Sequence, residues 1–136
     1  MRTNLDDSSS SRAEERRDLR VLVIDDEKFI ADTLVMILQD SGLEAVAAYD
    51  GATGVKEAQT FRPDVVISDV IMPGMNGIET CSVIQAKHPD CRCFLFSGQS
   101  ATMELIHEEK ARGIDWELLA KPIEPEELLA KLATLR

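Results

Sequence analysis

The 136-residue sequence contains no long hydrophobic run, and this absence excludes a membrane-spanning helix. A helix that crosses a bilayer needs roughly 20 consecutive apolar residues, and every apolar run in this chain is much shorter. The N-terminal segment MRTNLDDSSSS also lacks the apolar core of a signal peptide. We therefore expect a cytoplasmic protein that has no membrane partner.

Positive charge is scarce in this chain. The sequence has 15 Lys and Arg residues against 25 Asp and Glu residues, which gives a formal net charge of -10. Phosphate backbones and anionic lipids attract basic surfaces and repel acidic ones. We therefore expect no nucleic-acid partner, and a metal ion or another cation is the more natural ligand.

Cysteine is rare as well, and the three cysteines form no C-x-x-C motif. Cys91 and Cys93 would share one face of a strand, which suits reduced thiols in a reducing compartment. Cys81, His88, Cys91 and Cys93 could be drawn as a zinc set, but their spacing matches no recognisable ligand pattern. We therefore expect free thiols and no zinc site.

Residues 1–18 contain no Val, Ile or aromatic residue and are rich in Ser and charge. Such a segment cannot bury enough apolar surface to offset the entropy lost on ordering. We predict a disordered N-terminal tail over residues 1–18. Residues 19–136 then form a single domain, because 136 residues, 44% of them hydrophobic, leave room for one core.

After residue 18, short apolar runs alternate with longer amphipathic stretches. The apolar runs predict strands over residues 19–24, 43–48, 63–68, 91–96 and 116–120. The first predicted helix has apolar residues at positions 29, 30, 34, 37 and 38 and stops before Gly42. The other predicted helices cover residues 51–61, 79–88, 101–112 and 125–135. We expect Trp116, the Met residues and the stripe of Leu128, Leu129, Leu132 and Leu135 to lie in the core.

This strict alternation indicates an α/β fold with an open, doubly wound, five-stranded parallel sheet and helices on both faces. Each parallel pairing needs a crossover connection, and these crossovers are right-handed. In such sheets ligands bind outside the carboxyl ends of the strands, at the switch point in strand order. The residues at the strand ends are therefore the first candidates for a functional site.

Charged and hydroxyl side chains follow four of the five predicted strands. They are Asp25 and Asp26 after the first strand, Asp69 after the third, Ser97 after the fourth and Lys121 after the fifth. Two carboxylates about 4 Å apart repel by roughly 4 kcal/mol at an effective dielectric constant near 20, so three of them need a cation. A cluster of oxygen ligands favours Mg²⁺ or Mn²⁺ over zinc.

These residue types suit phosphoryl transfer. A carboxylate beside Mg²⁺ can attack phosphorus and form an acyl phosphate, while an ammonium and a hydroxyl stabilise the equatorial oxygens. Each residue alone has a plainer explanation: an Asp-Asp pair after a strand is usually a helix N-cap region, and a single lysine is usually solvated. Their joint occurrence at one sheet edge favours a site.

The segments VLVIDDE, ISDVIMPGMNG, FLFSGQ and LLAKPI, in this order, resemble the receiver domain of two-component response regulators over residues 19–136. The resemblance implies a flavodoxin-like sheet with strand order 2-1-3-4-5. It also implies a phosphoryl acceptor that receives its phosphoryl group from a sensor histidine kinase or a histidine phosphotransfer domain. The acceptor would later hydrolyse its own acyl phosphate, and would act as a switch on a downstream protein target.

The resemblance also implies a role for each candidate residue. Asp69 would accept the phosphoryl group, and Lys121 would form a salt bridge with it. Ser97 would turn toward the phosphoryl group. The metal ligands would be Asp25, Asp26, Asp69 and the main-chain carbonyl of Ile71. The Lys121-Pro122 peptide bond would be cis.

One position departs from the family pattern, and two other functions remain open. Leu118 stands where the family commonly has Tyr or Phe, and apolar Ile71 suggests a long-lived phosphoryl state. A Mg²⁺-dependent phosphatase would use the same chemistry, although its D-x-D nucleophile loop is missing. A binding module with a vestigial acidic site is the third possibility. We expect no output domain within these residues, so the output would act through protein contacts.

Overall fold

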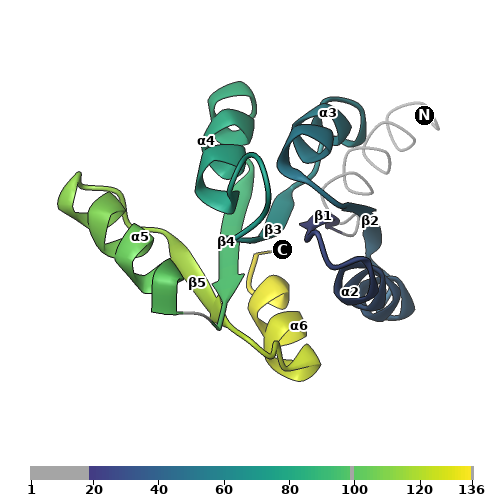
Figure 1. Ribbon diagram of the computed structural model, residues 1–136. Coiled ribbons are helices and arrows are strands. Elements are labelled where there is room, and N and C mark those ends of the chain that lie inside the picture. Colours follow the sequence, from purple (N-terminus) through teal and green to yellow (C-terminus); the bar gives the residue numbers. More distant parts are fainter. Residues whose placement is uncertain (1–18, 99, 136) are drawn as a thin grey trace, which may run out of the picture.

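The computed structural model describes residues 19–98 and 100–135 of the chain (Figure 1). The predicted disordered tail over residues 1–18 lies outside this described part. The strands are β1 (Arg20–Ile24), β2 (Glu44–Ala48), β3 (Val65–Asp69), β4 (Arg92–Ser97) and β5 (Glu117–Ala120). The helices are α2 (Lys28–Asp40), α3 (Gly51–Phe61), α4 (Gly77–Lys87), α5 (Ser100–Ala111) and α6 (Pro125–Ala133).

The five strands form one parallel sheet in the order β2-β1-β3-β4-β5, which confirms the predicted fold class and strand order. In the register, Val21 of β1 lies between Ala45 of β2 and Val65 of β3. The chain winds outward from β1 to β2 and then crosses to β3, so the switch point lies between β1 and β3. Because all strands run the same way, their carboxyl ends meet at one edge of the sheet.

Helices cover both faces of the sheet, and each face has its own core (Figure 1). Successive strand residues point to opposite faces. Leu22 and Leu95 pack with the cluster that includes residues of α3 and α4, whereas Val23 and Phe94 pack with residues of α2 and α6. Since both faces are covered, the central strands are apolar at nearly every position.

The core prediction is confirmed for Trp116 and for two of the four leucines in the C-terminal stripe, and it is wrong for two methionines; the other two leucines of the stripe are only half-buried. Leu128 and Leu132 are each 1% exposed, and Trp116 is buried. Met36 and Met103 are instead exposed, at 63% and 52%. Apolar character alone did not reveal which side of each helix faces the sheet.

The first turn of helix α2 also carries a large apolar residue that is exposed rather than buried. Its buried residues are Ala31, Leu34 and Leu38, which follow each other at helical spacing. Phe29 lies two residues before Ala31, about 200° around the helix axis, and is 82% exposed. This large exposed side chain therefore belongs to the surface of α2.

The loop between β3 and α4 is fixed by local hydrogen bonds. The Asn76 side chain accepts a hydrogen bond from the Glu79 N–H (2.8 Å), and the Glu79 side chain accepts one from the Asn76 N–H (2.9 Å). This capping box satisfies main-chain donors at the start of α4. Gly74, with a φ of 75°, makes the turn just before it.

The Lys121-Pro122 peptide bond is cis, as the resemblance implies.

Within the described residues, no helix combines the length and the apolar character that crossing a membrane requires.

Candidate functional site

The main chain places two aspartates side by side at the carboxyl edge of the sheet. Asp25 directly follows β1, and its N–H donates to the carbonyl of Ala48 (3.1 Å). Asp69 is the last residue of β3, and the next N–H, of Val70, donates to the carbonyl of Phe96 (3.3 Å). Because β1 and β3 are neighbours, both carboxylates stand at the switch point.

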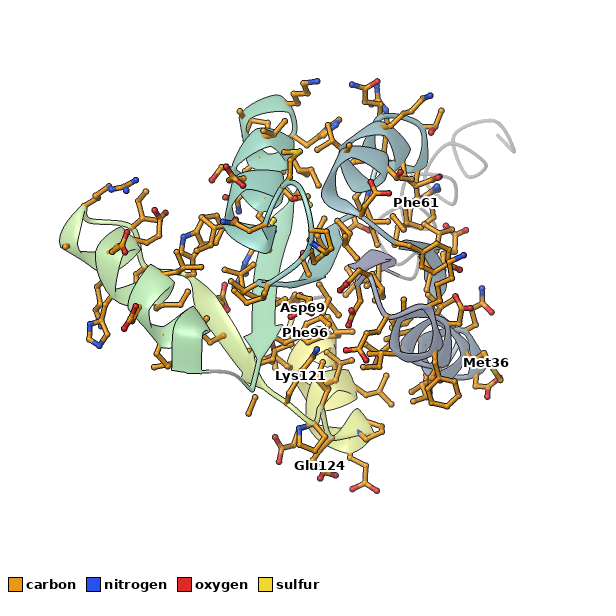
Figure 2. The ribbon with its side chains drawn as sticks, viewed as in Figure 1. Met36, Phe61, Asp69, Phe96, Lys121 and Glu124 are labelled. Carbon is orange, nitrogen blue, oxygen red and sulfur yellow. The ribbon has the colours of Figure 1, made fainter. Side chains whose placement is uncertain are left out.

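The structure brings four predicted residues together at this point. Oxygens of Asp25, Asp26 and Asp69 all lie within 4.8 Å of one another. The Lys121 Nζ lies 3.3 Å from Asp69 Oδ2 and 3.6 Å from Asp25 Oδ2. Figure 2 shows Lys121 directed toward Asp69 from the β5–α6 connection. Residues up to 96 positions apart in sequence, from Asp25 to Lys121, thus form one acidic cluster with one ammonium group.

The other two predicted residues are placed by the main chain. Ser97 is the last residue of β4 and pairs with Ala120 of β5, at the same edge as Asp69. The Ser97 hydroxyl lies outside the part of the chain that the structure describes. Ile71 is half-buried in the loop two residues after Asp69. Both residues therefore border the cluster.

Burial raises the pKa values of Asp25 and Asp69, the two buried carboxylates of the cluster. Asp25 is fully buried, and desolvation raises its pKa to about 6, against the opposing effect of the hydrogen bond from the Glu27 N–H (2.9 Å). The charge of Asp69 raises this pKa further and Lys121 lowers it. Burial also raises the pKa of Asp69, while Lys121 again acts in the opposite direction. One ammonium group does not fully neutralise the cluster.

The residues present fit a hard divalent cation. Asp25 Oδ2 is buried and accepts no hydrogen bond, although Lys121 lies 3.6 Å away. All side-chain donors in the cluster are carboxylate oxygens, which suit Mg²⁺ or Mn²⁺. A cation would supply the missing positive charge and a partner for this oxygen.

The alternative zinc set has a different environment. Cys81, Cys91 and Cys93 are buried free thiols. The hydrogen bond with Cys93 and then burial raise the pKa of Cys91. The hydrogen bond with Cys81 and then burial raise the pKa of Cys93, against the opposing effect of its hydrogen bond with Cys91. Both shifts oppose formation of the thiolate that binds zinc. Among residues 19–98 and 100–135, the only group that could hold a metal ion is the aspartate cluster.

The raised pKa of Asp25 predicts a pH-dependent metal effect. The folded chain retains a proton on Asp25 up to about pH 6, whereas the unfolded chain releases it near the model-peptide value of 3.8. Without metal, the contribution of Asp25 to the free energy of unfolding therefore falls as the pH rises from about 4 to 6. We expect Mg²⁺ to raise the melting temperature clearly at about pH 7.5 and very little at about pH 5, because protons compete for the site. Thermal unfolding with and without Mg²⁺ measures this, and an equal Mg²⁺ effect at both pH values would contradict it.

Two contributors to the site were missed in the sequence. The Lys121 Nζ lies 4.9 Å from the centre of the Phe96 ring, which helps to hold the ammonium over the end of β4. Gly77 lies so close to the strand end that a Cβ atom there would overlap the main-chain oxygen of Asp69. Phe96 could have been found from its place beside Ser97. The packing at Gly77 has no signal in the sequence.

An apolar groove of about 500 Å³ borders the site. It runs between α2 and the β5–α6 connection, and Lys121 forms part of its wall. Its apolar lining includes Phe29, Ile30 and Ile37 from α2, Pro122 and Ile123 from the connection, and Pro125 at the start of α6. The groove therefore joins the exposed Phe29 to the lysine that contacts Asp69.

Comparison with known proteins gives consistent matches. Residues 21–133 match the family described as the response regulator receiver domain. The chain is 29% identical over 113 residues to the DNA-binding response regulator MtrA of Mycobacterium tuberculosis, covering 83% of this chain and 48% of that protein. It is 32% identical over 115 residues to the probable transcriptional regulatory protein TcrX of the same species, covering 85% and 48%. The chain thus spans about half the length of these relatives.

Two solved structures show the same architecture. The chemotaxis protein CheY4 of Vibrio cholerae superposes with a TM-score of 0.75 at 32% identity, over 88% of this chain and 99% of that one. The receiver domain of the Francisella response regulator 1452 superposes with a TM-score of 0.72 at 26% identity, over 87% and 96%.

Proposed function

Because the chain belongs to the family of response regulator receiver domains, we propose that residues 19–136 form a receiver switched by phosphorylation of Asp69. The observation that carries this proposal is the contact of 3.3 Å between Lys121 and Asp69 inside the acidic cluster. The phosphoryl donor would be a phosphohistidine on a sensor histidine kinase or a histidine phosphotransfer domain. A protein would be the downstream target, and the cytoplasm the location.

The environments of the three carboxylates favour Asp69 as the nucleophile. Asp25 is fully buried, and one of its oxygens already accepts the Glu27 N–H. Asp26 is exposed, and no ion pair joins it to Lys121 in the described structure. Asp69 combines partial access, at 7% exposure, with a direct ammonium contact. It is therefore the carboxylate that can both reach phosphorus and share a cation with it.

The transfer would proceed as an in-line displacement. A carboxylate oxygen of Asp69 bonds to phosphorus as the bond from phosphorus to the histidine nitrogen breaks, which leaves an acyl phosphate on Asp69. Lys121 stabilises the charge on the phosphoryl oxygens. Asp25, Asp26, Asp69 and the Ile71 carbonyl would hold Mg²⁺, which supplies positive charge and orients the phosphoryl group when bound. Ser97 would donate a hydrogen bond to a phosphoryl oxygen.

The apolar groove beside the site is a candidate docking surface for the protein that donates the phosphoryl group. A donor that brings phosphorus to Asp69 must cover the surface around Lys121, and the groove lies on that surface. Phe29, 82% exposed at its wall, is a large apolar anchor of the kind that dominates interfaces. We therefore assign this groove to the phosphodonor.

Replacement of Phe29 separates donor docking from chemistry. In the Phe29→Asp variant we expect phosphotransfer from a kinase that phosphorylates the wild type to slow by at least about 10-fold, because a charge replaces an apolar anchor. Labelling by acetyl phosphate should stay unchanged, since this small donor needs no groove. Met36→Asp is the matched control, because Met36 is exposed on α2 outside the groove. Equal slowing in both variants, or slowed acetyl phosphate labelling, would contradict the assignment.

The proposed function itself is tested by intact mass. The protein is incubated with acetyl phosphate and Mg²⁺, and an adduct of about 80 Da that maps to Asp69 is expected. Chelation of Mg²⁺ before labelling should prevent the adduct. Turnover of small phosphate esters without an adduct would instead indicate the phosphatase. Absence of both would indicate a binding module.

A further inference from the structure

Helix α5 is fastened to β5 by a buried polar contact that the phosphorylation chemistry does not use. Glu109 of α5 is only 8% exposed. One of its oxygens accepts the indole N–H of Trp116 (3.1 Å), and the other lies 3.3 Å from Nη1 of Arg112. A buried carboxylate without such partners would be costly, so these contacts fix its place. The bond ties the second half of α5 to the residue that precedes β5.

The two halves of α5 are held differently. Ile106 and Glu109 are buried in the second half, whereas Met103 in the first half is 52% exposed. The first half follows closely on Ser97, at the sheet edge that carries Asp69. In Figure 1, α5 lies beside β5 at the margin of the molecule. A change near Asp69 therefore reaches the N-terminal half of α5 first, because that half follows Ser97 in the chain, while the Glu109–Trp116 bond anchors the other half.

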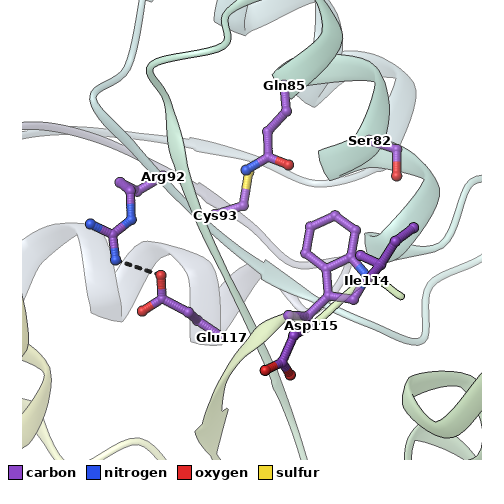
Figure 3. A pocket seen from close by; sticks show the side chains of 8 residues that line it. Ser82, Gln85, Arg92, Cys93, Ile114, Asp115 and Glu117 are labelled. Atoms are coloured by element: carbon purple, nitrogen blue, oxygen red, sulfur yellow. Dashed lines mark hydrogen bonds and ion pairs between the residues drawn. The ribbon is translucent and has the colours of Figure 1, made fainter. Parts of the chain in front are cut away.

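Trp116 also has free space beside it. A cavity of about 400 Å³ lies between α4 and the start of β5, and Trp116 forms part of its wall. Figure 3 shows Gln85 of α4 and Cys93 of β4 at this cavity, with the ion pair of Arg92 and Glu117 nearby. The indole is therefore fixed through its N–H but is not tightly packed on the cavity side.

We propose that the Glu109–Trp116 hydrogen bond is the pivot about which α5 turns when Asp69 is phosphorylated. Glu109 is then a positioning residue for the output of the switch. The position that commonly carries an aromatic in the family is Leu118, which is 41% exposed and has no polar group to make such a bond. The aromatic anchor of this chain stands two residues earlier, at Trp116. This inference rests on the proposed phosphorylation of Asp69.

The single tryptophan of the chain makes the proposal measurable. Trp116 fluorescence is recorded while phosphoramidate and Mg²⁺ phosphorylate the protein, and intact mass follows the adduct in the same sample. We expect a fluorescence change in the wild type that follows adduct formation and is absent in Asp69→Asn. In Glu109→Leu the adduct should form within about twofold of the wild-type rate, but the fluorescence change should be lost. Glu109→Gln should keep it, because an amide oxygen still accepts the indole N–H.

The outcomes separate this inference from the proposed function. No adduct in the wild type would overturn both. A normal adduct with the same fluorescence change in Glu109→Leu and the wild type would overturn only the pivot, as would loss of the change in Glu109→Gln. If Glu109→Leu does not fold, Trp116→Phe removes the same hydrogen bond. In the Trp116→Phe variant, phosphorylation should no longer alter amide hydrogen exchange in α5. If phosphorylation changes hydrogen exchange in α5 of this variant as much as it does in the wild type, the pivot is again overturned.

Discussion

Asp69→Asn is expected to abolish the phosphoryl adduct and to leave the folded chain at least as stable as the wild type. An amide is not a nucleophile toward phosphorus, so labelling by acetyl phosphate should fall by at least about 100-fold. Stability should not fall, because burial raises the pKa of Asp69, which means that its ionised form is disfavoured in the folded state. Lys121 keeps a carboxylate partner in Asp25, 3.6 Å away.

Intact mass and thermal unfolding measure the two parts of this prediction. Asp50→Asn is the matched control: the Asp50 carboxylate lies outside the cluster and accepts the Thr53 N–H (2.7 Å), a role that Asn can also fill. This control should keep the wild-type adduct. A full adduct on Asp69→Asn would show that another residue accepts the phosphoryl group. A clearly lower melting temperature would show that the Lys121 contact outweighs the cost of burial.

Gly77→Ala is expected to destabilise the fold by about 3 kcal/mol and to slow labelling of Asp69. Gly77 is the first residue of α4, where alanine would normally favour the helix by up to about 1 kcal/mol. A Cβ atom there would overlap the main-chain oxygen of Asp69, and a backbone atom cannot move aside as a flexible side chain can. The N–H of Gly77 also donates to the carbonyl of Val70 (2.8 Å), which fixes this close approach. Any relaxation therefore moves the end of β3 and the nucleophile with it.

Chemical denaturation and the rate of adduct formation test this prediction. Gly74→Ala is the control, because Gly74 has a φ of 75° but open space where a Cβ would stand. It should lose about 1 kcal/mol through backbone strain alone and should keep the wild-type labelling rate. A gain in stability for Gly77→Ala would show that helix propensity outweighs the contact.

The candidate site was largely predictable because it depends on chain order and strand ends. Asp25, Asp69 and Lys121 each end an apolar run, and a parallel sheet brings such ends to one edge. The residues outside this rule were missed. Glu109 reads as one of many charged residues of an exposed helix, yet it is buried against Trp116. Its burial depends on the position of α5 beside β5, which no local pattern specifies.

Exposure on helices was the least predictable property. Phe29 belongs to an apolar series with Leu34 and Leu38, but it lies on the opposite side of the helix from Ala31. The exposed Met36 and Met103 show the same limit. A helix buries only the stripe that contacts the sheet, and apolar residues outside that stripe remain on the surface.

The sequence by itself determined the alternation of strands and helices, the parallel sheet and the residues at its carboxyl edge. These features follow from local periodicity and from the handedness of crossovers, which act on every chain in the same way. The tertiary structure alone decided the distances within the aspartate cluster, the raised pKa of Asp25, the contact at Gly77, the exposure of Phe29 and the bond between Glu109 and Trp116. Each of these depends on the packing of segments far apart in the chain, and packing at van der Waals distance is set by the whole fold at once.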